Sequence, residues 1–194
     1  MARNTPTKVS YRALLVLALV ALGGYAFDQI SKALVVASMT EGETARVLGD
    51  VLQLHFIRNP GAAFSFATGL TWVFSLIAAG VVVFIVWFAR RIRSLRWATV
   101  FGLLLGGVLG NLTDRLFREP SFGLGHVVDF ISTPWMMPAI YNIADSCIVV
   151  SMVLFMLLTI RGIGLDGRRT TSADAAASAT DESPAAPAPL VTPN

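Results

Sequence analysis

Long apolar stretches separated by short polar segments dominate the pattern of hydrophobic and polar positions along the chain. These stretches cover residues 13–37, 70–89, 97–113 and 143–160. A helix needs about 20 residues to cross the hydrocarbon core of a bilayer, and all four stretches reach or approach that length. The pattern therefore predicts four transmembrane helices, an all-α polytopic membrane protein in its main architecture.

The connection between the first two predicted spans, residues 40–66, is longer than a simple turn requires. From Val47 to Arg58 apolar and polar residues partly alternate, which predicts one or two short strands lying on the membrane surface. Asn59-Pro60-Gly61 then interrupts the alternation. A plain connecting loop is the alternative interpretation, but long ordered loops tend to carry function.

Both ends of the chain differ from the apolar centre. Residues 166–194 consist mostly of Ala, Pro, Ser and Thr, a composition that cannot bury enough surface to offset ordering, so we expect a disordered cytoplasmic tail. The start resembles a secretory signal peptide, with a charged segment, an apolar stretch and small residues near Ala37. Asp28 and Lys32 interrupt that stretch, so we favour a retained first span.

Composition agrees with a membrane protein: 55% of the 194 residues are hydrophobic and only 14% are charged. If all four spans cross, ten of the fifteen basic residues lie on one side: Arg3, Lys8, Arg12, Arg90, Arg91, Arg93, Arg96, Arg161, Arg168 and Arg169. The positive-inside rule makes that side cytoplasmic. We thus expect a cytoplasmic segment 1–12, a membrane domain 13–165 with its outer loop at 40–66, and a cytoplasmic tail 166–194.

Two aspartates stand out because carboxylates at a membrane edge are costly and rare without a functional reason. Asp129 and Asp145 flank a short polar loop that returns to the outer face. Two carboxylates held close share one proton, so one activates water while the other protonates a carbonyl oxygen, as in aspartic proteases. The alternative is that Asp129 caps a loop and that Asn142 or Asp145 caps the fourth helix.

Other polar residues lie within or beside the spans. Asp28 and Lys32 are four apart and share a helix face, either as a snorkelling pair or as a pair that supports the site. Asn111 lies deep enough to require a partner, whereas Asp114 and Arg115 end the third span. The glycines at 102, 106, 107 and 110 predict close helix packing, and the lone cysteine, Cys147, is expected to pack as a small apolar residue.

Two other classes of protein compete with a protease. A small proton-coupled transporter also uses intramembrane carboxylates, but it predicts charges near mid-bilayer and often an internal repeat. Here the acids cluster at one edge and the two halves show no repeat. A structural membrane subunit would leave the outer concentration of Asn, Asp and Arg unexplained.

Five segments, taken in order, resemble the lipoprotein signal peptidase (signal peptidase II) family. They are Asp28-Gln-Ile-Ser-Lys32, Asn59-Pro-Gly61-Ala-Ala-Phe64, Gly106-Gly-Val-Leu-Gly110-Asn111-Leu-Thr-Asp114-Arg115, Val127-Val128-Asp129-Phe130 and Asn142-Ile-Ala-Asp145-Ser146. Each segment alone is weak evidence, whereas five in family order on four predicted spans are specific.

The resemblance implies a membrane-embedded aspartic endopeptidase of the bacterial inner membrane, with a small extracytoplasmic β-cradle and its active site on that side. Its substrates would be diacylglyceryl-modified prolipoproteins, cleaved before the lipidated cysteine. Asp129 and Asp145 would be catalytic; Asn59, Gly61, Asn111, Arg115 and Asn142 would bind substrate or globomycin-type inhibitors; Asp28, Lys32 and Asp114 would support the structure. The family implies no cofactor and no metal, and we expect membrane lipid but no nucleic acid as a partner, and a monomer.

Overall fold

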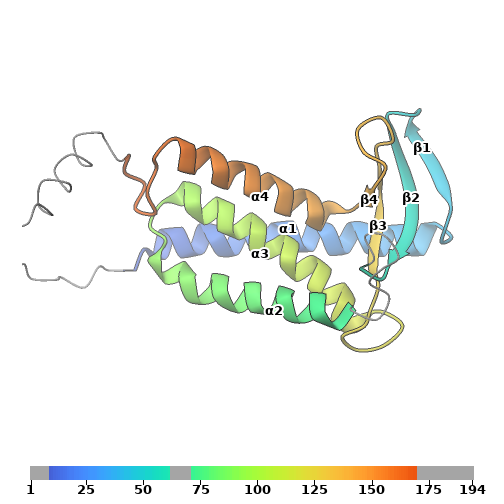
Figure 1. The fold of residues 1–194 in the computed structure, drawn as a ribbon, viewed down its shortest axis with the longest axis horizontal. Helices are drawn as coiled ribbons and strands as arrows, with labels where there is room; N and C mark the ends of the chain where they lie inside the picture. The colour runs from blue at the N-terminus through green and yellow to red at the C-terminus, as the bar shows by residue number, and fades with distance from the viewer. Residues whose placement is uncertain (1–8, 62–70, 170–194) are drawn as a thin grey trace, which may run out of the picture.

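The computed structural model describes residues 9–61 and 71–169. Four helices in this part meet the length and hydropathy needed to cross a membrane. They are α1 (Tyr11–Ser38), α2 (Thr71–Phe88), α3 (Leu95–Phe117) and α4 (Ile143–Ile160), with a short 3₁₀ turn, η1 (Ala89–Arg91), after α2. The four predicted helices are confirmed. The helices lie side by side, and α1 runs nearly the length of the described part of the molecule (Figure 1).

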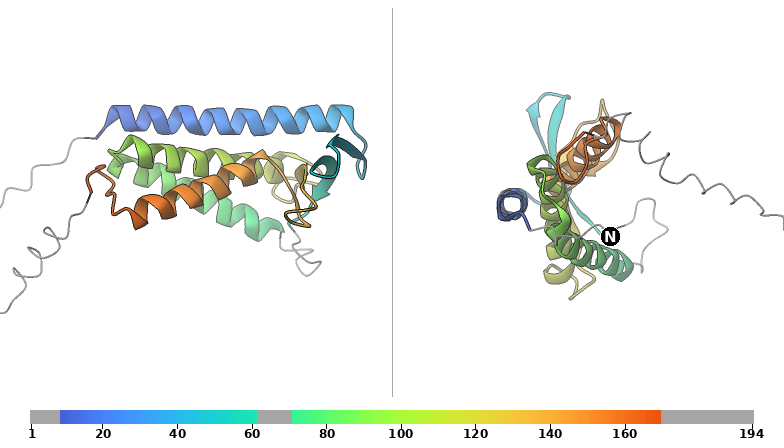
Figure 2. Two further views of the ribbon diagram at one scale, coloured as in Figure 1. Left: turned by 90° about the horizontal axis from the view of Figure 1, so that it is seen from above. Right: turned by 90° about the vertical axis from the view of Figure 1, so that its left-hand side faces the viewer.

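Helix α3 is the centre of the bundle, because most of its surface is covered while the other three helices expose most of theirs. It packs against α1, α2 and α4, as the end-on view shows (Figure 2). Large apolar side chains such as Leu15, Val83 and Met152 are exposed on the outer helices. Such a surface suits hydrocarbon surroundings rather than water.

Glycines allow α3 to approach two helices at once. A Cβ atom added at Gly106 would lie 2.6 Å from the backbone oxygen of Ala21 on α1, and one added at Gly107 would lie 2.5 Å from that of Ala144 on α4. Gly102 and Gly110 also face α1. The expectation of close packing is therefore confirmed. Gly107 faces α4, the helix that carries Asp145, rather than α1.

A four-stranded antiparallel sheet crosses one end of the bundle (Figure 1). Its strands follow the order β1 (Thr44–Leu48), β2 (Leu52–Asn59), β3 (Val127–Ser132) and β4 (Ile140–Tyr141). Strands β1 and β2 confirm the one or two short strands expected in this part of the chain. Asp129 lies on β3, where it pairs with Ile57 of β2, so it belongs to a strand beside the expected polar loop rather than merely capping a loop.

A small second core fixes the sheet to the helices. Val35 near the end of α1 packs with Phe56 of β2 and with Val128 and Phe130 of β3. Side chains alternate along a strand, so Asp129 points to the face opposite Val128 and Phe130. The apolar side chains of β3 thereby hold the orientation of the carboxylate between them.

Both described ends of the chain lie at the end of the bundle away from the sheet (Figure 1). After α4, residues 161–169 fold back as a hydrogen-bonded turn in which Ile163 pairs with Arg169. The described part thus reaches four residues into the segment 166–194 that we expected to be a tail. Residues 170–194, and Ala62 to Phe64 of the second family-like segment, lie outside the described residues.

Candidate active site

Asp129 is almost completely buried, with 2% of its surface exposed. Its two carboxylate oxygens each accept a hydrogen bond from a side-chain amide: Asn59 Nδ2 at 2.8 Å and Asn142 Nδ2 at 2.7 Å. The pKa of Asp129 is raised to about 6, mainly by burial and also by the negative charge of Asp145, against the lowering effect of the amides of Asn59 and Asn142. Asp129 therefore holds a proton far more readily than an exposed aspartate does.

Asp145 lies in the first turn of α4 and is only partly buried. Its backbone N–H donates to Asn142 Oδ1 at 2.9 Å, and its carboxylate accepts from the backbone N–H of Asn142 at 3.2 Å, which is a complete capping box. Asn111 Nδ2 donates to the other carboxylate oxygen at 2.7 Å. Both carboxylate oxygens of Asp145 therefore accept hydrogen bonds, one from the backbone of Asn142 and one from the side chain of Asn111.

Two asparagines connect the aspartates. Asn142 Nδ2 lies 2.7 Å from Asp129 Oδ1 and 3.1 Å from Asn111 Oδ1, while Asn111 Nδ2 reaches Asp145. Asn142 is fully buried and Asn111 nearly so. The four side chains, from β3, α3 and α4, thus form one continuous hydrogen-bonded group that sets the geometry of the carboxylate pair.

A cluster of buried charged side chains contacts this hydrogen-bonded group of Asp and Asn side chains through Asn111. Lys32 Nζ lies 2.8 Å from Asp28 Oδ2 and 2.9 Å from Asp114 Oδ2, and all three side chains are 0% exposed. Lys32 also donates to Asn111 Oδ1 at 3.0 Å. The snorkelling interpretation of Lys32 is wrong, because its ammonium points into the bundle and bridges α1 to α3.

Asp28 and Asp114 also accept hydrogen bonds from the backbone of neighbouring elements. Asp28 Oδ1 accepts the backbone N–H of Ala144 at 2.9 Å, one residue before Asp145. Asp114 Oδ2 accepts the backbone N–H of Val128 at 3.1 Å, one residue before Asp129. Each supporting carboxylate therefore fixes the backbone beside one member of the pair, a relationship that the sequence did not reveal.

Arg115 lies beside the pair on α3. Its Nη1 donates to the backbone oxygen of Asn111 at 3.3 Å and its guanidinium lies 5.9 Å from the ring centre of Phe74 on α2. Within residues 9–61 and 71–169, Arg115 Nε is buried without a hydrogen-bond partner.

Asn59 Oδ1 accepts the backbone N–H of Gly61 at 2.9 Å, and this closes the turn at Gly61, where φ is +93°.

Sequence reasoning missed three members of this region. Gln29 Nε2 donates to Asp28 Oδ2 and to the backbone oxygen of Gly110, both at 3.1 Å. Arg118 Nε donates to Asp114 Oδ1 at 2.7 Å. Gln29 could have been identified from the sequence because it lies between Asp28 and Lys32. No pattern in the sequence pointed to Arg118 or Phe74.

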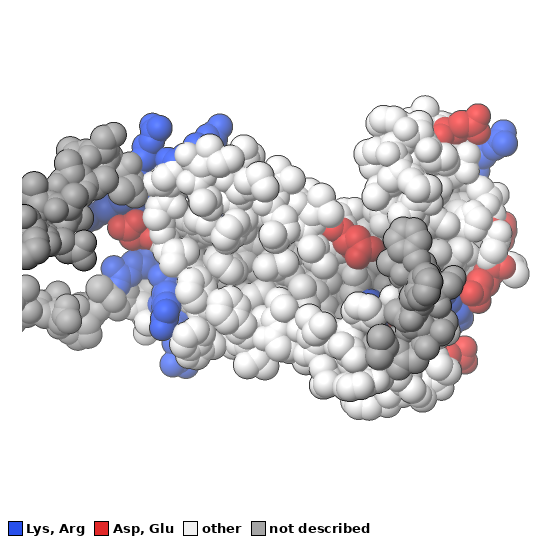
Figure 3. Space-filling model, in the orientation of Figure 1, with Lys and Arg blue, Asp and Glu red and all other residues white. Residues whose placement is uncertain are grey.

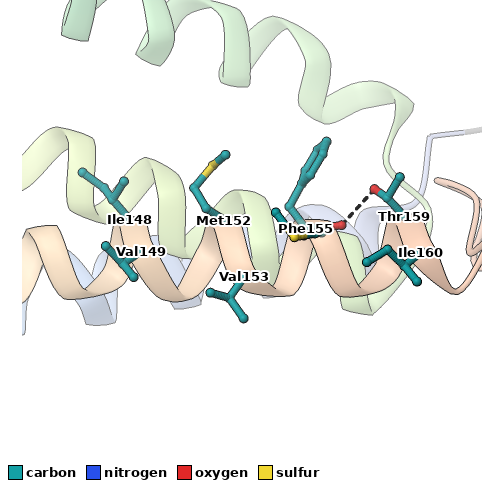
Figure 4. A pocket seen from close by; sticks show the side chains of 8 residues that line it. Ile148, Val149, Met152, Val153, Phe155, Thr159 and Ile160 are labelled. Atoms are coloured by element: carbon teal, nitrogen blue, oxygen red, sulfur yellow. Dashed lines mark hydrogen bonds between the residues drawn. The ribbon is translucent and has the colours of Figure 1, made fainter.

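Apolar hollows lead away from Asp145 along α4. The first, of about 360 Å³, is lined by Asp145 together with Met136, Met137, Tyr141, Ser146, Val149 and Val150. The second, of about 460 Å³, continues from Ile148 and Val149 to Ile160 (Figure 4). In that view Ile148, Met152 and Phe155 project to one side of α4, and Val149 and Val153 to the other. The polar site therefore opens onto a surface suited to hydrocarbon chains.

In the described part of the chain, no group of three His, Cys, Asp or Glu side chains is arranged to hold a metal ion. Of the predicted site residues, the structure brings Asp129, Asp145, Asn59, Asn111 and Asn142 into hydrogen-bonded contact, with Asp28, Lys32 and Asp114 packed beneath. The described part thus combines four helices able to span a membrane with a small sheet that carries a buried polar site. These features define a multi-pass membrane protein whose site lies at one end of the bundle.

Comparison with known proteins identifies the class. Residues 20–161 match the family model described as signal peptidase (SPase) II, so the chain belongs to the signal peptidase II family and is a membrane protease. A protein of Leifsonia xyli subsp. xyli named lipoprotein signal peptidase is 60% identical over 184 residues, which is 95% of this chain and 84% of that protein. One of Rhodococcus jostii with the same name is 45% identical, over 84% of this chain and 82% of that protein.

Solved structures agree with the fold. A bacterial membrane enzyme determined by the in meso method at 1.9 Å resolution superimposes with a TM-score of 0.66 at 28% identity. The match covers 79% of this chain and 97% of that one. The resemblance inferred from the five segments is therefore confirmed at the level of the family.

Proposed function

We propose that this protein is an aspartic endopeptidase that removes signal peptides from diacylglyceryl-modified prolipoproteins by cutting before the lipidated cysteine. The observation that carries the proposal is the hydrogen-bonded group in which Asn142 and Asn111 join Asp129 to Asp145. The family supports a lipoprotein precursor as substrate, because its curated members are named lipoprotein signal peptidases.

The environments of the two carboxylates support different roles for them. Asp129 is buried with its pKa raised to about 6, so it is the proton donor to the scissile carbonyl oxygen. Asp145 is partly exposed and accepts hydrogen bonds on both oxygens at the start of α4, so it is the base that activates water. As water attacks, Asp145 takes its proton and Asp129 gives its own to the carbonyl oxygen, which leaves a neutral tetrahedral intermediate.

The neighbouring groups position the substrate. Arg115 and Asn59 flank the pair from α3 and β2 and are placed to bind backbone carbonyls of an extended peptide. Asn111 and Asn142 hold the aspartates, and Gly61 keeps the turn beside them free of a side chain. The diacylglyceryl group would lie in the apolar hollow lined by Met136, Tyr141 and Val149, next to Asp145.

The charge distribution supports an orientation in the bacterial inner membrane. Arginines collect at the end of the bundle away from the sheet, whereas most acidic side chains lie at the sheet end (Figure 3). The positive-inside rule then makes both termini cytoplasmic and the aspartate pair extracytoplasmic. A lipidated precursor would reach the site by diffusion in the outer leaflet.

The test is a gel-shift assay of the purified full-length protein with a diacylglyceryl-modified prolipoprotein and with its unlipidated precursor. We expect cleavage of the lipidated form alone, inhibition by globomycin, and no cleavage by Asp145→Asn. Asp50→Asn is the matched control, since Asp50 is an exposed aspartate in the turn between β1 and β2. Cleavage of the unlipidated precursor at an equal rate would contradict the proposed substrate, and activity in Asp145→Asn would contradict the mechanism.

A further inference from the structure

A second charged region lies at the end of the bundle opposite the aspartate pair (Figure 3). Its basic residues are Arg90, Arg91, Arg93, Arg96, Arg161, Arg168 and Arg169. Asp166 is the acidic residue among them, and its carboxylate lies 3.9 Å from Arg168 Nε. In residues 9–61 and 71–169 that is the only ion pair formed by any of these arginines. The cluster therefore carries a large uncompensated positive charge.

The turn after α4 is built onto this end of the bundle. The backbone oxygen of Leu165 accepts the N–H groups of Arg93 at 3.0 Å and Ser94 at 2.9 Å, at the junction between α2 and α3. Trp97 Nε1 donates to the backbone oxygen of Ile163 at 3.0 Å, and Ile163 is buried against the main core. These contacts fix the turn, and with it the backbone of Arg169, which pairs with Ile163.

The turn and the helix ends border two open hollows. One, of about 280 Å³, is lined by Arg96, Arg161 and Arg169 together with Ile163 and Gly167. The other, of about 410 Å³, is lined by Arg90, Arg91, Arg93, Leu165 and Asp166. The three arginines that line the smaller hollow belong to three elements: the first turn of α3, the end of α4 and the turn beyond it.

We propose that the smaller hollow binds the phosphate of an anionic phospholipid headgroup. Guanidinium groups pair with phosphate oxygens through two parallel hydrogen bonds, and three of them line this hollow. Basic pockets at the membrane-facing ends of helices are known sites for anionic headgroups. The orientation of the protein in the membrane would explain positive charge on this side. It would not explain why three arginines line a concave hollow beside a turn that is held by hydrogen bonds.

The surroundings favour a lipid over a soluble anion. Leu95 directly precedes Arg96 and is 51% exposed, and Ile160 directly precedes Arg161 and is 75% exposed. Ile160 thus lies on the membrane side of Arg161, and Leu95 adds an exposed apolar side chain next to Arg96 at the start of α3. Ile160 also belongs to the apolar hollow along α4 (Figure 4). A phosphate held by the arginines would place its acyl chains along these apolar surfaces.

The experiment measures the thermal unfolding midpoint of the full-length protein in a neutral detergent as dioctanoyl phosphatidylglycerol is added. A ligand that binds only the folded state raises this midpoint. We expect a saturable rise with phosphatidylglycerol and little change with dioctanoyl phosphatidylcholine. In Arg96→Gln/Arg161→Gln, measured against its own lipid-free midpoint, the lipid concentration giving half the rise should increase at least about tenfold.

Two variants distinguish binding in the smaller hollow from general attraction of the lipid to positive charge on the protein. Arg12→Gln/Arg46→Gln removes the same charge from positions outside the hollow and should change the half-point less than about twofold. Arg96→Lys/Arg161→Lys keeps the charge but lacks the planar fork, and should weaken binding measurably. Equal weakening in Arg12→Gln/Arg46→Gln, or an unaltered half-point in the lysine variant, would overturn the site.

A third arm distinguishes the source of the phosphate. Inorganic phosphate at the same concentrations should give no rise, because it lacks the acyl chains that contact Leu95 and Ile160. An equal rise with inorganic phosphate would overturn the lipid assignment in favour of a soluble anion. An equal rise with phosphatidylcholine would show that negative headgroup charge is not recognised, and would also overturn the proposal.

Discussion

The side-chain amide of Asn142 lies 2.7 Å from Asp129 Oδ1, although the two residues are 13 positions apart and belong to different kinds of element. The same asparagine is the N-cap of α4, where its Oδ1 accepts the backbone N–H of Asp145. One buried side chain thus caps the helix that carries one aspartate and donates to the other. Folding of α4 and alignment of the pair are consequences of the same contacts.

Asp129→Asn and Asp145→Asn should each lower the rate of cleavage by roughly 10²-fold to 10⁴-fold, because each variant loses either the proton donor or the base. The fold should persist, because the asparagine side chain has nearly the same shape. The measurement is the rate of prolipoprotein cleavage at equal concentrations of folded protein, compared with Asp50→Asn. Turnover at the parent rate in one of the two variants would show that a single carboxylate suffices.

The pH dependence of cleavage should report the proton on Asp129. Because burial raises the pKa of Asp129 to about 6, the protonated form needed for catalysis is lost as the pH rises through that value. We expect kcat/KM to fall above about pH 6, approaching tenfold per pH unit. A profile that stays flat between pH 5 and 8 would contradict the assignment of Asp129 as the acid.

Asn59→Ala should move this alkaline limb to higher pH. The amide of Asn59 stabilises the ionised form of Asp129 and thereby lowers its pKa, so removing it favours the protonated form. Gln53→Ala is a suitable control, since Gln53 lies on the same strand and bonds to Asp50 instead. The experiment compares kcat/KM profiles of the three proteins; a limb that moves to lower pH in Asn59→Ala would contradict the role of this amide.

Much of the fold was predictable because a membrane span needs a long apolar run, and such runs are visible without tertiary information. Strand β3 was not predictable in the same way. Val127-Val-Asp129-Phe-Ile is short, and it becomes a strand only because β2 pairs with it and the end of α1 covers Val128 and Phe130. These partners are distant in sequence, so local alternation gave no sign of them.

The candidate site was predictable in its members but not in its connections. Carboxylates and amides in an apolar chain are conspicuous, and the five family-like segments assigned them roles. Spacing did not reveal that Asp28 binds the backbone beside Asp145, or that Asp114 binds the backbone beside Asp129. Sequence alone left open whether Lys32 snorkels or supports the site, because its burial depends on two carboxylates from different helices.

Lys32→Met should lower the stability of the protein strongly. Lys32 is the cation between two fully buried carboxylates, and removing one partner of a buried ion pair costs roughly 3–5 kcal/mol. The free energy of unfolding in mild detergent measures the effect. Arg46→Met should change little, because its pair with Asp50 is exposed and 3.7 Å long. Adding Asp28→Asn and Asp114→Asn to Lys32→Met should restore part of the loss; a further loss would show that the cluster is not held by charge.

Gly107→Ala should disturb catalysis although Gly107 touches neither aspartate. The added Cβ would lie 2.5 Å from the backbone oxygen of Ala144, so α4 must move away from α3. Asp145 follows Ala144 directly and would lose its hydrogen bond from Asn111 on α3. Displacements of about 1 Å at a catalytic group cost on the order of 10²-fold in rate. Gly23→Ala is the matched control, since a Cβ there meets nothing within 4 Å. Cleavage rates of the two folded variants decide the point: equal rates would mean that close packing of α3 on α4 does not position Asp145.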